Sequence, residues 1–438
     1  MDLAGAEAYL AERIGLGIRP GNERIAALLE ALGRPQDSLR AIAVAGTNGK
    51  FSVASMTSSV LESLGLVVGL YTSPHIGSVV ERIRIAGSDV SGDAFGGLLA
   101  YLSPYIELVE AERGDRLTYF ETITAMAIEA FFDRAVHVAV LEAGLGGEWD
   151  ATNVVDAEVA VVTNIGLDHI VEFGGDLERA AWEKAGIVKE GAAVVTGVTQ
   201  PELLRVVEER ALERASGPLL RLGREIEIAE RHPAVGGQSF TVRTPLRAYE
   251  DLYLPAFGAH QALNAALAVA AAESFAGAEL DPEGVAAGLE SVRLPARVET
   301  VARHPLVVVD GGHNIDSATA VLTTLTQELE HDRLLVVAGM LEDKQVEEVM
   351  GILAGAGQAF YLAAPSSDRA ADPSRLAGGL LDAGVPGARI AVHDRVADAM
   401  SEALDAAGEE DLVLVFGSFY TAGEAKAWLR ATGRVAQR

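Results

Sequence analysis

The sequence predicts an α/β protein with two doubly wound, mostly parallel sheets, and three observations lead to this prediction. First, apolar runs without alternation are typical of strands buried on both faces, and they cover 41–46, 67–72, 136–142 and 158–164. Second, helical patterns separate these runs, at about 49–64, 92–112 and 121–134. Strands that alternate with helices favour a parallel sheet. Third, a second series of the same kind starts after a proline-containing connector at 293–298.

The pattern of apolar residues changes in the middle of the chain. Short strands are expected at 219–229, 239–242 and 248–254, as a small antiparallel sheet at the edge of the first domain, and helices at about 260–275 and 281–290. The second series of strands is expected at 306–310, 334–338, 359–363 and 412–416. We therefore expect a P-loop-type domain over 1–296 and a Rossmann-like α/β domain over 297–438.

Composition excludes several classes of protein. The net charge of −28 argues against a nucleic-acid partner, since a phosphate backbone requires a basic face. No apolar run reaches the length of about 20 residues that a membrane helix needs, and the N-terminus lacks a basic leader region. The chain has no cysteine, which excludes disulfides and thiolate metal sites. We expect a cytoplasmic protein, with a monomer as the default state.

The most informative segment is Gly46-Thr-Asn-Gly-Lys-Phe-Ser52, which lies between a predicted strand and a predicted helix. Glycines allow backbone N–H groups to point at one centre, and the following helix adds positive potential. Lys50 would place a formal charge near the outer phosphates of a nucleotide. The usual P-loop pattern would need glycine at 44 and serine or threonine at 51, where this chain has Val44 and Phe51. By itself the segment fits either a nucleotide loop or an ordinary strand–helix turn.

Ten short motifs in order give the segment a context. They occupy 46–50, 71–75, 81–84, 141–147, 150–153, 166–169, 183–187, 260–264, 295–297 and 310–314. Together they resemble the folylpolyglutamate synthase/dihydrofolate synthase family of the Mur ligase superfamily, over nearly the whole chain. The resemblance implies an ATP-dependent ligase in which a folate or dihydropteroate carboxylate becomes an acyl phosphate and is then attacked by the amine of L-glutamate. It also implies a Mur-ligase-type ATP-binding domain over 1–296 and a glutamate-ligase domain over 297–438.

The resemblance assigns residues to ATP and to Mg²⁺. The ATP-binding set comprises Gly46, Thr47, Asn48, Gly49, Lys50, Ser52, Asn264, Arg297 and Asp310. The expected metal ligands are Ser73, Glu142 and His169. Histidine is an unusual ligand for Mg²⁺, which prefers oxygen, so this third ligand rests on the resemblance alone.

The catalytic residues that the resemblance implies are Lys184, Arg297, Asp310 and His313. Lys184 matches a lysine that is carbamylated in the family, and carbamylation requires an uncharged amine. Arg297 matches an arginine that reaches ATP phosphate. For His313, two roles remain open: accepting the proton of the incoming ammonium, or hydrogen bonding to phosphate.

Substrate-binding residues also follow from the resemblance. The set comprises Arg82, Tyr119, Phe120, Glu121, Thr122, Trp149, Asp150, Ala151 and Ser418. Asp150 is expected to accept hydrogen bonds from a pterin, and Ser418 to lie near the glutamate site.

Two departures from the family pattern and several alternatives remain. Phe51 stands where a small residue is usual, and we expect it to point into the helix packing. Glu148-Trp149 replaces an arginine and an aliphatic or aromatic residue, which leaves open a ligase for a non-folate acid. A cell-wall Mur ligase would carry a further domain before the loop, and a nucleotide-binding switch would not need Lys184 or His313. We expect a bifunctional enzyme, with a dedicated polyglutamate synthase as the alternative.

Overall fold

The computed structural model describes residues 1–168, 173–214 and 216–434, which form two compact units. The first unit comprises Met1–His232, Ser239–Pro255 and Gln261–Val292. The second comprises Pro233–Gln238, Ala256–His260 and Arg293–Arg438. The second unit therefore includes two short stretches of the chain that precede the predicted boundary at 296/297.

The first unit contains an eight-stranded sheet with the order β4-β3-β2-β5-β1-β6-β7-β8. Its strands are β1 (Ala41–Ala45), β2 (Val68–Tyr71), β3 (Ile83–Ile85), β4 (Ser88–Asp89), β5 (Val138–Glu142), β6 (Val159–Val162), β7 (Ala193–Thr196) and β8 (Leu219–Arg221). The strands from β2 to β8 in this order pair in parallel, whereas β3 and β4 are antiparallel additions at one edge. Every residue of β1, β2, β5, β6 and β7 is buried, which explains their uninterrupted apolar sequences.

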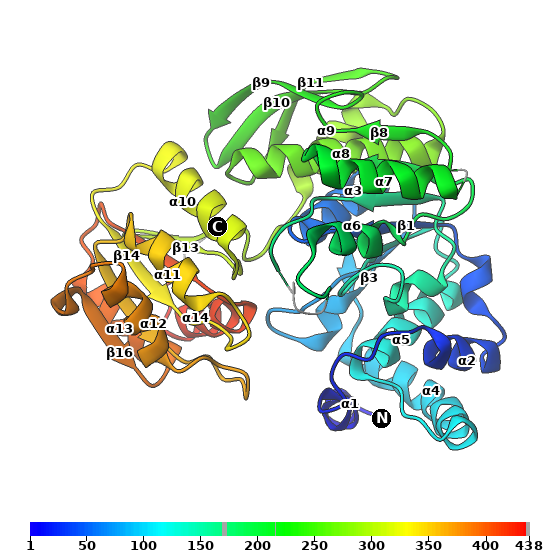
Figure 1. Ribbon diagram of the computed structural model, residues 1–438, viewed down its shortest axis with the longest axis horizontal. Coiled ribbons are helices and arrows are strands. Elements are labelled where there is room, and N and C mark those ends of the chain that lie inside the picture. The colour runs from blue at the N-terminus through cyan, green and yellow to red at the C-terminus, as the bar shows by residue number, and fades with distance from the viewer. Residues whose placement is uncertain (169–172, 215, 435–438) are drawn as a thin grey trace. The chain divides into compact units, whose positions relative to one another are not determined.

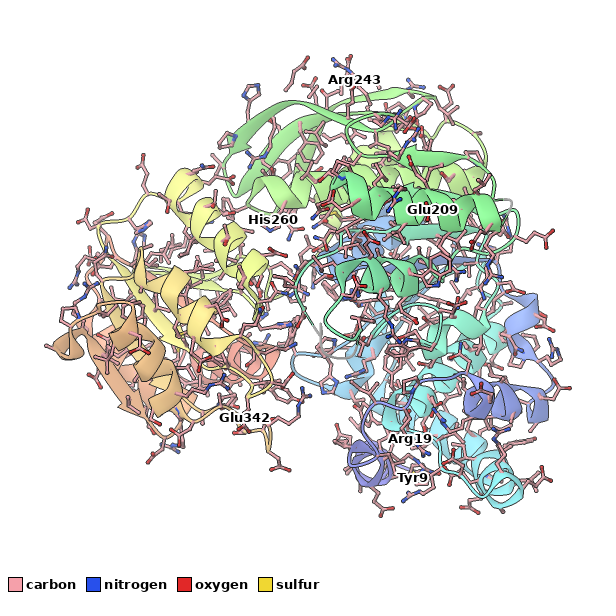
Figure 2. The ribbon with its side chains drawn as sticks, in the orientation of Figure 1. Tyr9, Arg19, Glu209, Arg243, His260 and Glu342 are labelled. Atoms are coloured by element: carbon pink, nitrogen blue, oxygen red, sulfur yellow. The ribbon has the colours of Figure 1, made fainter. Side chains whose placement is uncertain are left out.

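The helices of this part of the chain connect the strands. They are α1 (Leu3–Ile14), α2 (Glu23–Ala31), α3 (Lys50–Ser63), α4 (Gly92–Arg113), α5 (Tyr119–Asp133), α6 (Leu177–Ala185), α7 (Pro201–Glu213), α8 (Ala259–Ala276) and α9 (Pro282–Ser291), with the short 3₁₀ turns η1 (Pro35–Ser38), η2 (Val79–Arg82) and η3 (Ala151–Val154). Figure 1 shows α6, α7 and α8 near one another in green tones and α1, α2, α4 and α5 in blue to cyan. Arg19, labelled in Figure 2, follows α1 and pairs with Asp115 at 2.7 Å, just after α4.

A three-stranded sheet has the order β11-β10-β9 and consists of β9 (Glu227–Ala234), β10 (Gly237–Arg243) and β11 (Ala248–Leu254). The expectation of one antiparallel strand over 219–229 is wrong. Residues 219–221 form β8, which extends the large sheet in parallel with β7, and only the residues from Glu227 onward enter the small sheet. A turn between them, in which Gly223 N donates to Ile226 O at 2.7 Å, divides the two strands.

The second unit contains a six-stranded sheet with the order β12-β13-β17-β14-β15-β16. The strands are β12 (Glu299–Arg303), β13 (Leu306–Val309), β14 (Leu334–Ala338), β15 (Ala359–Ala363), β16 (Ile390–His393) and β17 (Leu412–Phe416). All neighbours pair in parallel except β12, which is antiparallel to β13. Its helices, drawn in yellow to red in Figure 1, are α10 (Ile315–Glu328), α11 (Val346–Ala354), α12 (Pro373–Asp382), α13 (Val396–Ala406) and α14 (Phe419–Ala431), with η4 (Gly387–Arg389).

In open α/β folds, ligands bind beyond the carboxyl ends of the strands, at the point where the connections to the neighbouring strands leave in opposite directions. Both large sheets have such a point at their central strands. In the first unit this point is the end of β1, between β5 and β6. In the second unit the ends of β13 and β17 carry the predicted residues Asp310 and Ser418. None of the helices that the structure describes combines the length and the apolar character that a membrane span requires.

Candidate active site

The loop from β1 to α3 requires glycine at two positions. Gly46 has φ 148° and Gly49 has φ 82°, which are conformations that favour glycine. A Cβ atom on Gly46 would lie 1.9 Å from the Thr163 hydroxyl, so no larger residue fits without displacing that side chain. The loop therefore runs close to the end of β6 and opens at the N-terminus of α3, as a phosphate cradle requires.

The segment after β6 holds this loop. Thr47 N donates to Asn164 O at 2.9 Å, and Asn48 N donates to Asn164 Oδ1 at 2.8 Å. In return, the Thr163 hydroxyl donates to Asn48 O at 2.6 Å, and Gly166 N donates to Thr47 Oγ1 at 2.9 Å. Sequence reasoning missed Thr163 and Asn164, although two polar residues directly after a buried strand were a usable signal.

Lys50 and Ser52 lie in the first turn of α3. The Lys50 ammonium donates to the carbonyl oxygens of Gly46 (2.9 Å) and Thr47 (3.1 Å), so it folds back over the loop. Ser52 is fully buried, and its hydroxyl has no hydrogen-bond partner in the described part of the chain. A buried hydroxyl of this kind beside a phosphate cradle fits a bound phosphate or its metal ion. Phe51 is half-buried, and the direction we expect for its ring stays a prediction.

Asn264 comes to the same loop from a distant part of the sequence. It lies on α8, whose second residue, His260, is labelled in Figure 2. A Cβ atom on Gly49 would lie 2.6 Å from Asn264 Oδ1, which shows that the amide lies against the loop. Gln261 Oε1 accepts a hydrogen bond of 3.1 Å from Asn264 Nδ2. The structure thus brings Asn264 and the loop together, as the motifs predicted.

Glu142 and Ser73 are also neighbours. Glu142 ends β5 opposite Val44 of β1, and its side chain is almost fully buried. Its Oε2 accepts a hydrogen bond of 2.9 Å from Ser73 N. A carboxylate and a hydroxyl are hard oxygen ligands, and this donor set fits Mg²⁺. The third expected ligand, His169, lies outside the described residues, and the described residues alone contain no cluster of three acidic, histidine or cysteine side chains able to hold a metal ion.

Lys184 is the most unusual charged residue of the first unit. It lies on α6 with 3% of its surface exposed, and its ammonium is 5.0 Å from the centre of the Phe173 ring. Burial lowers the pKa of Lys184 to about 7, and the positive charge of Lys50 acts in the same direction. Gly147 permits this packing, since a Cβ atom there would lie 2.7 Å from Lys184 O. The side chain therefore carries a large fraction of neutral amine near neutral pH.

One cluster of aromatic and basic side chains combines residues that follow β2 with the first residues of α5. Arg82 Nε donates to His75 Nδ1 at 3.0 Å, and the Arg82 guanidinium carbon lies 5.3 Å from the centre of the Tyr119 ring. Burial and the Arg82 charge lower the pKa of His75 to about 4, so His75 is a neutral acceptor. The Phe120 ring lies over Gly144, where a Cβ atom would be only 2.6 Å away.

Glu121 and Thr122 have clear local roles in α5. Glu121 Oε2 accepts a hydrogen bond from Thr118 N at 2.7 Å, which completes a capping box, and Oε1 accepts one from Arg24 Nε at 2.9 Å. The Thr122 hydroxyl donates to Thr118 O at 2.9 Å. Both side chains are buried and already make these hydrogen bonds. The substrate contacts expected for Glu121 and Thr122 therefore remain predictions without support from this geometry.

Asp150 shapes the loop that contains Ala151. Its Oδ2 accepts hydrogen bonds from Gly144 N and Leu145 N, both at 2.9 Å. Its Oδ1 accepts from Thr152 N at 3.0 Å and from the Thr152 hydroxyl at 2.7 Å. A carboxylate has about four acceptor positions, so a hydrogen bond to a pterin would come in addition to four that are already made. That contact stays a prediction.

The two residues of the unusual pair Glu148-Trp149 lie in different environments. Glu148 Oε1 lies 2.9 Å from the guanidinium of Arg210, a buried residue of α7, and 3.6 Å from that of Arg214. Trp149 packs with its ring centre 6.3 Å from that of Phe173, the residue that also contacts Lys184. Glu148 therefore has a structural partner of opposite charge, whereas Trp149 is the member of the pair that lies close to a catalytic candidate.

In the second unit, Arg297 and His313 lie beside one aromatic ring, and Asp310 lies in the adjacent backbone turn. The guanidinium carbon of Arg297 lies 4.7 Å from the centre of the Phe419 ring, and the His313 ring lies 6.2 Å from it in an edge-on arrangement. Asp310 Oδ2 accepts from Val298 N (2.8 Å), and Oδ1 accepts from Gly312 N (2.7 Å). Burial raises the pKa of Asp310, and the Arg297 charge opposes this effect.

His313 and Ser418 complete this group. His313 Nδ1 lies 3.0 Å from Gly311 O, which can only accept, so Nδ1 carries the hydrogen and Nε2 is the basic atom of the neutral ring. Ser418 is the N-cap of α14, and its hydroxyl accepts a hydrogen bond of 3.0 Å from Thr421 N. The sequence identified every residue of this group except Phe419, which was read only as part of the loop after the last strand.

Comparison with known proteins agrees with both parts of this arrangement. Residues 44–272 match the Mur ligase middle domain, and residues 296–419 match the Mur ligase glutamate ligase domain. The dihydrofolate synthase/folylpolyglutamate synthase of Mycobacterium tuberculosis is 36% identical, over 93% of this chain and 90% of that protein. The chain belongs to the dihydrofolate synthase/folylpolyglutamate synthase family of Mur ligases.

Solved structures of this family have the same fold. The Mycobacterium tuberculosis folylpolyglutamate synthase complexed with ADP matches with a TM-score of 0.92 and 36% identity, over 97% of both chains. E. coli FolC in complex with DHPP and ADP matches with a TM-score of 0.88 and 32% identity, over 99% of both chains. The predicted family and fold class are therefore confirmed. The phosphate loop, Glu142 and Lys184 lie within the middle-domain match, and Arg297, Asp310, His313 and Ser418 lie within the glutamate-ligase match.

Proposed function

We propose that this enzyme uses ATP to join L-glutamate to a folate or dihydropteroate carboxylate through an acyl phosphate, and that it accepts both acids. The observation that carries the proposal is the meeting of the glycine loop and Glu142 at the ends of two paired strands, β1 and β5. It supplies a phosphate cradle and a buried carboxylate for a metal side by side, in a family that includes solved structures complexed with ADP.

For the phosphoryl transfer we assign distinct roles to the loop and to the charged side chains. The backbone N–H groups of the loop and the Lys50 ammonium bind the β- and γ-phosphates, and Ser52 contributes its hydroxyl. Ser73 and Glu142 would hold Mg²⁺, with His169 as the third candidate ligand. When bound, the ion neutralises charge on the transferred phosphoryl group. Asn264 contacts the nucleotide base.

Lys184 has a role that depends on its neutral amine. Attack of this amine on CO₂ forms a C–N bond and releases one proton, and the resulting carbamate is an anion able to help organise the metal. The burial and lowered pKa of Lys184 support this assignment.

For the second half of the reaction we assign the residues of the second unit. The glutamate amine attacks the acyl carbon, the C–O bond to phosphate breaks, and the ammonium proton must be removed. His313 Nε2 accepts this proton, Asp310 orients the backbone beside it, and Arg297 binds the phosphoryl oxygens. Ser418 lies at the glutamate site. Arg82, Tyr119, Phe120, Trp149, Asp150 and Ala151 line the pocket for the acid.

Three broader assignments accompany this mechanism. We propose an ATP-binding domain over 1–296 and a glutamate-ligase domain over 297–438, a monomeric enzyme and a cytoplasmic location. Size-exclusion chromatography with light scattering tests the monomer, and expression of 1–296 alone with a nucleotide-binding assay tests the domain assignment.

Phosphate release from MgATP and L-glutamate, measured separately with dihydropteroate and with a reduced folate, tests the central proposal. Release with both acids is the expected result. Release with the reduced folate alone would identify a polyglutamate synthase. No release with either acid, while ATP still binds, would direct attention to a non-folate acid and to Trp149.

A further inference from the structure

The backbone on either side of Arg297 has an unusual conformation. Ala296 has φ 52° and Val298 has φ 47°, so both residues lie in the left-handed region. For a β-branched residue such as valine this conformation is a genuine outlier. Backbone of this kind persists only when its surroundings impose it, and it is concentrated at functional sites. What imposes the conformation here also determines where Arg297 points.

Hydrogen bonds hold both flanking peptides. Ala296 N donates to Glu299 Oε2 at 2.8 Å, and Gly311 N donates to Ala296 O at 3.0 Å. On the other side, Val298 N donates to Asp310 Oδ2 at 2.8 Å. Two carboxylates, one before and one after β13, therefore fix the two ends of the turn.

One of these carboxylates is itself fixed by the last helix. Lys426 of α14 donates to Glu299 Oε2 at 2.6 Å, the same oxygen that accepts from Ala296 N. The Lys426 side chain is 10% exposed and that of Glu299 is 26% exposed, so water screens this ion pair only in part. Because α14 also begins with Phe419, whose ring contacts the Arg297 guanidinium, one helix supports both the peptide before Arg297 and the side chain itself.

We propose that Glu299 and Lys426 are positioning residues that hold the 296–298 turn in its left-handed conformation and thereby aim Arg297. The inference rests on the proposed role of Arg297 in binding phosphoryl oxygens. Neither residue needs to touch a substrate, since each acts through the backbone of Ala296. Lys426 is one of only five lysines in the chain, together with Lys50, Lys184, Lys189 and Lys344.

Kinetics of single and double variants test this inference. Lys426→Met and Glu299→Ala should each lower kcat at least about tenfold, with little change in the KM for ATP, because misplacing a positioned group affects turnover strongly. Lys426→Arg keeps the charge and should restore most of the activity. In an Arg297→Ala background, Lys426→Met should cause no further loss, because both changes remove the same function. Arg375→Met is the matched control, since it breaks an ion pair with Glu347 in the same unit without touching the turn.

A second measurement does not depend on turnover. In arginine side-chain ¹H–¹⁵N spectra of the unliganded protein, the Arg297 signal is identified by its loss in Arg297→Ala. Its proximity to the Phe419 ring makes it sensitive to orientation. Lys426→Met should shift this signal, and Arg375→Met should leave it in place.

The outcomes separate the inference from the proposed function. An unmoved Arg297 signal in Lys426→Met, or losses of kcat that add in the double variant, would overturn the positioning role. A wild-type kcat that survives Arg297→Ala would overturn the role of Arg297 itself and the inference with it. A shifted signal together with non-additive losses would support both.

Discussion

The neutral amine of Lys184 gives the sharpest quantitative prediction. The ordinary pKa of a lysine is 10.5, and in the folded protein burial lowers that of Lys184 to about 7. At about 1.4 kcal/mol for each pKa unit, a charged ammonium at this position opposes folding by about 5 kcal/mol. Below about pH 7 the lysine is charged in both the folded and the unfolded protein, so the full destabilisation of about 5 kcal/mol is present. It diminishes as the pH rises from about 7 to 10.5.

The small number of lysines makes the pKa directly measurable. With [ε-¹³C]lysine, the protein contains five labelled side chains, and the Lys184 signal is the one that disappears in Lys184→Met. In CO₂-free buffer this signal should titrate with a midpoint near 7. Unfolding free energies should also rise with pH more steeply for the wild type than for Lys184→Met, by up to about 1.4 kcal/mol per pH unit above pH 7. A Lys184 midpoint near 10.5, or parallel stability profiles for the two proteins, would refute the reasoning.

Three further changes test other parts of the site. Gly46→Ala should weaken ATP binding, measured by calorimetry, at least about tenfold. The new Cβ would collide with the Thr163 hydroxyl, and the φ of this position disfavours alanine. Unchanged affinity would contradict the assignment of this loop as the phosphate cradle. Glu142→Gln should raise the magnesium concentration for half-maximal ATP turnover about tenfold or more, and an unchanged magnesium titration would remove Glu142 as a ligand. Glu148→Ala should lower the free energy of unfolding in urea by about 1 kcal/mol, because it leaves the buried Arg210 without this partner, while the KM for the folate substrate stays constant. A changed KM with unchanged stability would instead place Glu148 in the substrate pocket.

Most of the buried parallel strands were predictable, although β7 (Ala193–Thr196) was missed. Strands such as β1, β6 and β17 are covered on both faces, so every residue is apolar and the sequence shows a continuous run. The edge strands β4, β12 and β16 of the two large sheets were not predicted, because a strand with one paired side and partial exposure, such as β16, needs no such run. The same reason explains the error at 219–229, a range that combines a three-residue edge strand, a turn and the start of β9.

The candidate site divides in a similar way. Residues that lie in short local motifs, such as Lys50, Glu142 and Asn264, were recognised as candidates because the order of the motifs made each one stand out. Lys426, a partner supplied by a distant segment, was missed because a single hydrogen bond across more than a hundred residues leaves no local pattern.

In the proposed function, the contacts of Lys50 make ATP binding an exchange reaction. Its ammonium donates to the carbonyl oxygens of Gly46 and Thr47. A phosphate oxygen must displace these two acceptors, and the carbonyl groups must then find water or other donors. The affinity for ATP therefore depends on the difference between the hydrogen bonds that Lys50 gives up and those that it forms with phosphate. A small binding enthalpy would be compatible with strong phosphate contacts. The same self-contact holds the cation inside the loop, so that the positive charge and the loop backbone are preorganised around one centre.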